Sequence, residues 1–176
     1  YSQAELERLG FKFLGDMENV TLSSIFPSMR TFLRTMYCEN GAVQAAIYDV
    51  KMRSLFMKSL QLVGLLPRDM RTIDMETEFS NGLFICTTNA GQQAAALKRP
   101  PQIYSNNMPK TLSPEEMFRY HLSQVEHYLA SYPDVKLIRC STLLSSLDSQ
   151  KRMQILKNRY REEQGWITRE ELIRVA

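Results

Sequence analysis

Apolar residues recur every three or four positions through the first third of the chain, the spacing that places side chains on one face of a helix. This spacing predicts a short helix over residues 5–14, a second from Ser23 or Ser24 to Gly41, and a third over residues 43–63. The second helix has the most regular stripe, formed by Ile25, Met29, Phe32, Leu33 and Met36. We therefore expect a helical N-terminal third.

The middle of the chain is richer in turn residues and β-branched residues. Residues 68–78 are polar and predict a surface connection, and the turn Asn81-Gly82 leads into a predicted strand over residues 83–88. The Ala-rich segment 92–99 predicts a short helix that a pair of prolines stops, and residues 105–110 predict a polar loop. We expect the strand over residues 83–88 to be central in a small sheet.

A helix-strand-helix unit over residues 112–164 has the clearest boundary signals. Ser113 is a candidate N-cap, and Pro114 and two glutamates follow it in the first turn, where the helix dipole favours carboxylates. The stripe of this helix is Phe118, Leu122, Val125 and Leu129. A short strand over residues 135–140 comes next. Asp148 is the expected cap of a second helix that ends before Gly165. Its inner face would hold Met153, Leu156 and Tyr160.

Composition places the chain among soluble globular proteins with one α+β domain. The chain has 176 residues, 44% apolar and 23% charged, and it lacks both a long apolar run and a basic leader followed by one. Cys38, Cys86 and Cys140 are odd in number and far apart, which predicts free thiols in a reducing compartment. The expected architecture is a helical N-terminal third followed by a small mixed sheet flanked by helices.

Charge is unevenly distributed along the chain. Residues 1–80 hold 9 basic and 10 acidic side chains, whereas residues 81–176 hold 13 basic and 9 acidic side chains. The basic second half could contact nucleic-acid phosphates without reading sequence, and the candidates are Lys98, Arg99, Lys151 and Arg152. The alternative is an ordinary solvated surface.

The sequence predicts no catalytic residue, metal site or cofactor. His121 and His127 are six positions apart and would face opposite sides of one helix, without a cysteine at ligand spacing. The turn 89–93 lacks the glycine-rich pattern of a phosphate loop. Cys86, in the predicted strand, is expected to act as a small buried hydrophobe and not as a nucleophile.

The alternative hypothesis is that the chain is an endonuclease domain. Asp74, Glu76 and Glu78 precede the predicted strand, and Lys98 follows it, whereas metal-dependent nucleases combine carboxylates on one strand with an acid and a lysine on the next. Residues 84–88 read Phe-Ile-Cys-Thr-Thr, so the second carboxylate is missing. The chain could therefore be only an inactive or degenerate version of a viral polymerase endonuclease domain of the influenza type, located in the cytoplasm or the virion.

Three stretches carry a resemblance to a known family. The stretch IFPSMRTFLRTMYCENG, at residues 25–41, resembles the opening helix of the shared fifth subunit of eukaryotic nuclear RNA polymerases, which forms part of the lower jaw. Residues 82–98 resemble that family's jaw strand, turn and small-residue helix. Residues 125–176 resemble its following helix, strand and second helix, with a Leu-x-x-Arg-Tyr signature at Leu156 to Tyr160. The family normally has two or three more strands where this chain has only residues 68–81.

The resemblance implies a jaw-like, restriction-endonuclease-like core. It divides the chain into an extension at residues 1–22, a jaw-like α+β domain at 23–140, and a linker and the start of an assembly domain at 141–176. It also implies a noncatalytic nuclear subunit that docks on the largest polymerase subunit and others and lines the path of downstream DNA. No membrane or small-molecule substrate is implied. The expected subunit contacts are Leu156, Tyr160 and Trp166.

Overall fold

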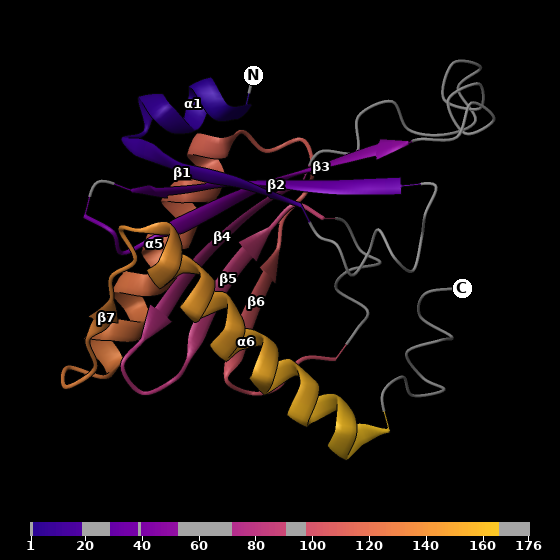
Figure 1. Cartoon of the computed structure of the whole chain (residues 1–176). Coiled ribbons are helices and arrows are strands. Elements are labelled where there is room, and N and C mark those ends of the chain that lie inside the picture. The colour runs from indigo at the N-terminus through magenta and orange to yellow at the C-terminus, as the bar shows by residue number, and fades with distance from the viewer. Residues whose placement is uncertain (1, 19–28, 39, 53–71, 91–97, 166–176) are drawn as a thin grey trace.

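The computed structural model describes residues 2–18, 29–38, 40–52, 72–90 and 98–165. Its elements, in chain order, are α1 (Ser2–Arg8), β1 (Phe11–Glu18), β2 (Met29–Cys38), β3 (Gln44–Met52), β4 (Thr72–Phe79), β5 (Phe84–Thr88), β6 (Ile103–Asn107), α5 (Pro114–Ser131), β7 (Leu137–Ile138) and α6 (Leu143–Gln164). Figure 1 shows a twisted sheet with α5 behind it and α6 in front of it.

The six longer strands lie in the sheet in sequence order. Neighbours from β1 to β5 are antiparallel, whereas β5 and β6 are parallel. The short β7 pairs with the end of β4, opposite Glu78 and Phe79. This arrangement makes β4 and β5 interior strands, and every residue of β5 is buried. The expectation that the strand over residues 83–88 is central is therefore confirmed.

The two faces of the sheet have different covers. On the face toward α1 and α5, the main core includes the buried side chains Leu6, Met36, Met75 and Met117. On the face toward α6, a smaller cluster joins Phe84, Cys86, Ile103 and Met153, with Leu156 at its margin. Because successive residues of a strand point to opposite faces, β4 and β5 contribute to both layers.

The prediction of a helical N-terminal third is wrong, because the described part of that third is mostly strand. The predicted helix 5–14 is the short α1 followed by the start of β1, and the predicted helix ending at Gly41 contains β2 instead. Gly41 has a φ of +68° and forms the turn of a β2-β3 hairpin, where its N–H donates to the Cys38 carbonyl at 2.7 Å. The third predicted helix begins as β3, and its residues 53–63 lie outside the described residues.

Strand β2 explains this error. Its apolar residues occupy adjacent positions such as Phe32 and Leu33, both partly buried, as well as alternating ones. Apolar residues at both kinds of position reproduce the helical spacing of three and four. Its threonine, phenylalanine, tyrosine and cysteine content also fits a pleated strand between two neighbours.

Two further segments differ from expectation. The predicted surface connection 68–78 contains most of β4, and the predicted polar loop 105–110 begins as the second half of β6. The predicted helix 92–99 falls largely on residues outside the described ranges. The polar character of β4 misled the prediction because its carboxylates are buried, as described below.

The helix-strand-helix unit is confirmed. Ser113 caps α5 through a capping box with Glu116, and Pro114 occupies the first turn. The strand between the helices is shorter than predicted, at Leu137–Ile138. The second helix begins earlier than expected, since Thr142 and not Asp148 is the N-cap of α6. Gly165 ends this helix as predicted, with a φ of +79°.

Candidate functional site

From Ile73 onward, strand β4 alternates between apolar or neutral residues and carboxylates. Ile73, Met75, Thr77 and Phe79 point toward α1 and α5, and Asp74, Glu76 and Glu78 point toward α6. Antiparallel pairing places Thr88 and Cys86 of β5 beside Asp74 and Glu76, on the same face. The three carboxylates thus form an acidic row beneath α6.

Each carboxylate of this row has a polar partner. The Thr88 hydroxyl donates to Asp74, and the Gln150 side-chain amide of α6 donates to Glu76. Glu78 is 3% exposed and receives two hydrogen bonds from the Arg152 guanidinium, at 2.6 and 2.8 Å. Such bidentate pairing offsets much of the cost of burying a charge.

Burial changes the acidity of the two inner carboxyls. Desolvation, followed by the nearby Asp74 carboxylate, raises the pKa of Glu76 from 4.5 to about 7. Desolvation also raises the pKa of Asp74, although the Thr88 hydroxyl and the charges of Arg99 and Lys157 act in the opposite direction. Near neutral pH, Glu76 is therefore divided between its protonated and ionised forms.

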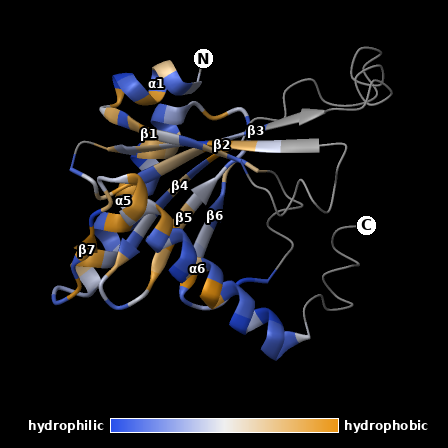
Figure 2. Cartoon of the chain, in the orientation of Figure 1, coloured by the Kyte–Doolittle hydropathy of each residue, from blue (hydrophilic) through white to orange (hydrophobic). Residues whose placement is uncertain are grey.

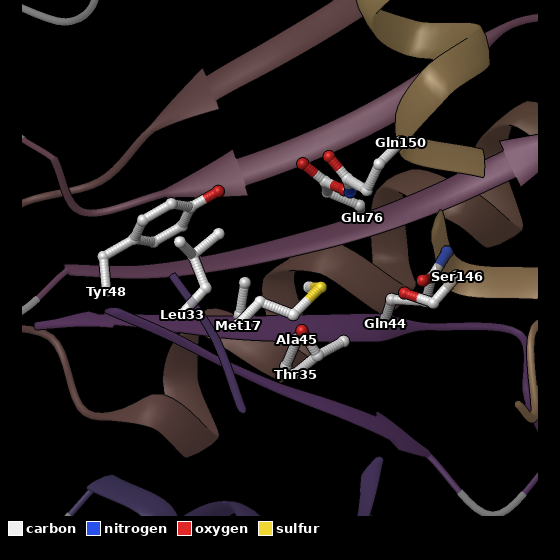
Figure 3. A pocket seen from close by; sticks show the side chains of 10 residues that line it. Met17, Leu33, Thr35, Gln44, Ala45, Tyr48, Glu76, Ser146 and Gln150 are labelled. Carbon is white, nitrogen blue, oxygen red and sulfur yellow. The ribbon is translucent and has the colours of Figure 1, made fainter. Parts of the chain in front are cut away.

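A small cavity lies beside Glu76, between α6 and strands β2 and β3 (Figure 3). Its volume is about 20 Å³, which is enough for about one water molecule. Three of its lining residues have a buried polar atom without a hydrogen-bond partner, namely Thr35 Oγ1, Gln44 Oε1 and Ser146 Oγ. The rest of the lining is largely apolar and includes Leu33 and Met17. This cavity suits an ordered water and is too small for an organic substrate.

Tyr48 of β3 lies beside Asp74, at one end of the acidic row. Burial is the largest cause of its pKa being well above its usual value, and the carboxylates of Asp74 and Glu76 add to this effect. The phenol therefore stays protonated and can donate a hydrogen bond to Asp74. Tyr48, Thr88 and Gln150 were missed by sequence reasoning. The alternation of Asp74, Glu76 and Glu78 with apolar residues was the available signal for the row itself.

The four predicted phosphate contacts do not form one continuous group. Lys98 and Arg99 lie near the second half of α6, where the Arg161 guanidinium donates to the Lys98 carbonyl. Lys151 is well exposed in the first half of α6 and lies 3.6 Å from the Asp148 carboxylate. Arg152 forms an ion pair with Glu78, and 48% of its side chain is exposed. Figure 2 shows that the second half of α6 is predominantly hydrophilic.

The predicted subunit contacts have mixed positions. Leu156 is partly buried and packs against the small cluster beneath α6. Tyr160 is partly exposed, with the Arg161 guanidinium 5.9 Å from its ring centre. Trp166 lies outside the described residues. Within α6, Leu144 and Ile155 are more exposed than either, at 75% and 58%.

The histidines lie away from the acidic row, whereas Cys86 lies beside Glu76 on the same face. His121 is fully buried on the other face, and its two ring nitrogens lie 2.9 Å from the hydroxyls of Thr77 and Thr87. Burial lowers the pKa of His121 to about 4, so the ring is neutral. His127 is exposed on α5. All three cysteines are free and buried, and burial raises the pKa of Cys86 far above its usual value, which opposes a role as nucleophile.

The turn considered as an anion site has a structural role. The Asn89 side-chain oxygen accepts a hydrogen bond from the Ile73 N–H at 2.8 Å, which ties the end of β5 to the start of β4. Within the described ranges, no three His, Cys, Asp or Glu side chains are grouped so that they could hold a metal ion. None of the described helices is long and apolar enough to cross a bilayer.

No family model, curated protein or solved structure matches this chain.

Proposed function

We propose that this chain is a noncatalytic structural subunit of a DNA-dependent RNA polymerase, one that docks on the largest subunit and lines the path of downstream DNA in the nucleus. The observation that carries the proposal is the basic surface formed by residues 98–99 and the second half of α6, which Arg161 joins through its bond to the Lys98 carbonyl. Lysine and arginine side chains on a projecting helix suit contact with phosphates and do not require base recognition.

The order of helices and strands along the chain partly supports this proposal. Residues 114–164 form a helix, a short strand and a helix, in the order that the resemblance to the jaw subunit implies. Residues 84–88 form the strand that it implies. The first of the three similar stretches gives no support, because it contains β2 where the family's helix was expected.

Copurification tests the proposal directly. Tagged full-length protein would be isolated from its own cells at moderate salt, and the bound proteins identified by mass spectrometry. We expect large polymerase subunits in amounts near equal to the bait. Their absence would remove this function from consideration.

A DNA-binding measurement tests the basic surface separately. Affinity for duplex DNA should fall with salt. The double variant Arg99→Ala and Arg159→Ala, with Arg159 exposed in the second half of α6, should reduce the slope of log K against log salt by about 2, roughly one for each phosphate contact. Lys110→Ala and Lys136→Ala, which remove two exposed lysines from loops outside α6, form the matched control with the same loss of charge. An equal effect of both double variants would show that only net charge matters.

One observation favours a second candidate, a degenerate endonuclease-like domain. The charges of Lys157 and Arg99 act on Asp74 and Glu76, so carboxylates and a lysine come together although the sequence spacing did not suggest this pair. A manganese-dependent cleavage assay on DNA and RNA distinguishes this candidate. Cleavage by the wild-type chain that Asp74→Ala abolishes would replace the structural proposal.

A further inference from the structure

The small cavity beside Glu76 brings together polar side chains from one face of the sheet. Gln44 of β3 is directly opposite Glu76 of β4. Thr35 of β2 is directly opposite Ala46, which is two residues after Gln44. Directly opposite residues of neighbouring strands point to the same face, and so do residues two apart in one strand. Thr35, Gln44 and Glu76 therefore all point toward α6.

Helix α6 supplies the other polar residues of the cavity. Ser146 and Gln150 both line it, and they are four positions apart, so they lie on the same side of the helix. The Gln150 side-chain amide donates to the Glu76 carboxylate, which fixes α6 over this part of β4. Figure 3 shows the side chains of α6 and of the strands around the cavity.

The unpartnered polar atoms around the cavity are all oxygens. They are Thr35 Oγ1, Gln44 Oε1 and Ser146 Oγ, on residues that are 4%, 6% and 1% exposed. A buried polar atom without a partner costs free energy, so native structures rarely leave three of them around one cavity. Hydroxyl, amide and carboxylate oxygens are the ligands that hard cations prefer in proteins.

The charge around the cavity favours a cation over a neutral molecule. Glu76 is the only aspartate, glutamate, lysine or arginine among the described residues that line it. In the described part of the chain, no lysine or arginine forms an ion pair with Glu76, and Lys157 and Arg99 act on it only as nearby charges. A buried carboxylate is normally paired with a cation or bound to a metal ion.

We infer that this cavity binds one monovalent alkali cation, held by the Glu76 carboxylate and by the three unpartnered oxygens. One carboxylate balances one positive charge, whereas a divalent ion would bring a second charge into the interior without a counterion. The volume of about 20 Å³ is enough for about one water molecule, so it admits a bare ion of similar size and excludes an organic cation. This inference does not depend on the polymerase proposal.

Urea unfolding of the full chain in different chloride salts at pH 8 tests the site. Sodium, potassium and choline chloride would be compared at equal ionic strength. Choline is too large for the cavity, so its series shows the protein without a bound cation. Sodium or potassium should stabilise the fold in a concentration-dependent way, and the unfolding equilibrium constant should fall about elevenfold at ten times the dissociation constant. Equal stability in all three salts would overturn the inference and leave the cavity to water alone.

Three variants connect the salt effect with the cavity. Glu76→Gln removes the charge and should abolish the difference between the alkali salts and choline, whereas Glu126→Gln, at an exposed position of α5, should keep it. Ser146→Ala keeps the charge, removes one oxygen and should weaken the apparent affinity for the ion several-fold. If Ser146→Ala fails to fold, Thr35→Val replaces it, because valine has nearly the shape of threonine. A salt effect that survives Glu76→Gln, or an affinity unchanged by the loss of either hydroxyl, would overturn the inference.

Discussion

Replacement of Glu76 by glutamine should stabilise this protein at alkaline pH. The Glu76 carboxyl is buried between β4 and α6, where its pKa is about 7, compared with an ordinary value of 4.5. Between these two pH values the folded state binds more protons than the unfolded state, so the stability of the wild type falls as pH rises through the window. At 1.36 kcal/mol per pKa unit, the full loss is about 3 kcal/mol above pH 7. Glutamine cannot ionise, and its side-chain oxygen can still accept the hydrogen bond from Gln150.

Urea unfolding from about pH 4.5 to pH 8.5 measures this effect. The useful quantity is the difference in unfolding free energy between Glu76→Gln and the wild type, because the titration of other groups cancels in it. The difference should be small at the acid end and reach about 3 kcal/mol in favour of the variant above pH 7. Glu126→Gln makes the same substitution at an exposed position of α5 and is the matched control. A constant difference across the pH range for Glu76→Gln would refute the reasoning, since it would mean that Glu76 does not titrate there.

Three other substitutions have expected outcomes in the same urea assay. His121→Leu leaves the Thr77 hydroxyl without its ring partner and should cost about 2 kcal/mol at pH 7. Because the folded state lowers the pKa of His121 from 6.5 to about 4, the wild type should lose stability as pH falls through this window, and the variant should lose less. Arg152→Ala leaves the buried Glu78 carboxylate unpaired and should cost about 2 kcal/mol, part of which Glu78→Gln should restore in the double variant. Gly41→Ala should cost about 1 kcal/mol, because its φ is +68°, whereas Gly41→Asn should cost less.

Local signals determined the C-terminal half of the fold. Ser113, Pro114 and Glu116 specify the start of α5 through the hydrogen bonds of the capping box, and these involve only neighbours in sequence. Gly165 ends α6 for a similar reason, since a left-handed conformation suits glycine. The turn at Gly82 was equally predictable, with its N–H donating to the Phe79 carbonyl at 2.9 Å. Such contacts can be predicted from the sequence because they join residues that are close together in it.

The tertiary structure alone decided the N-terminal strands and the acidic row. Phe32 and Leu33 fit a helix stripe, and they lie in a strand only because β1 and β3 supply backbone partners on both sides. The Asp74 and Glu76 carboxylates are buried because Thr88 of β5 and Gln150 of α6 reach them from distant parts of the chain. Hydrogen bonds between strands and helices far apart in sequence leave no local pattern, so the sequence by itself could show three alternating carboxylates but not that α6 covers them.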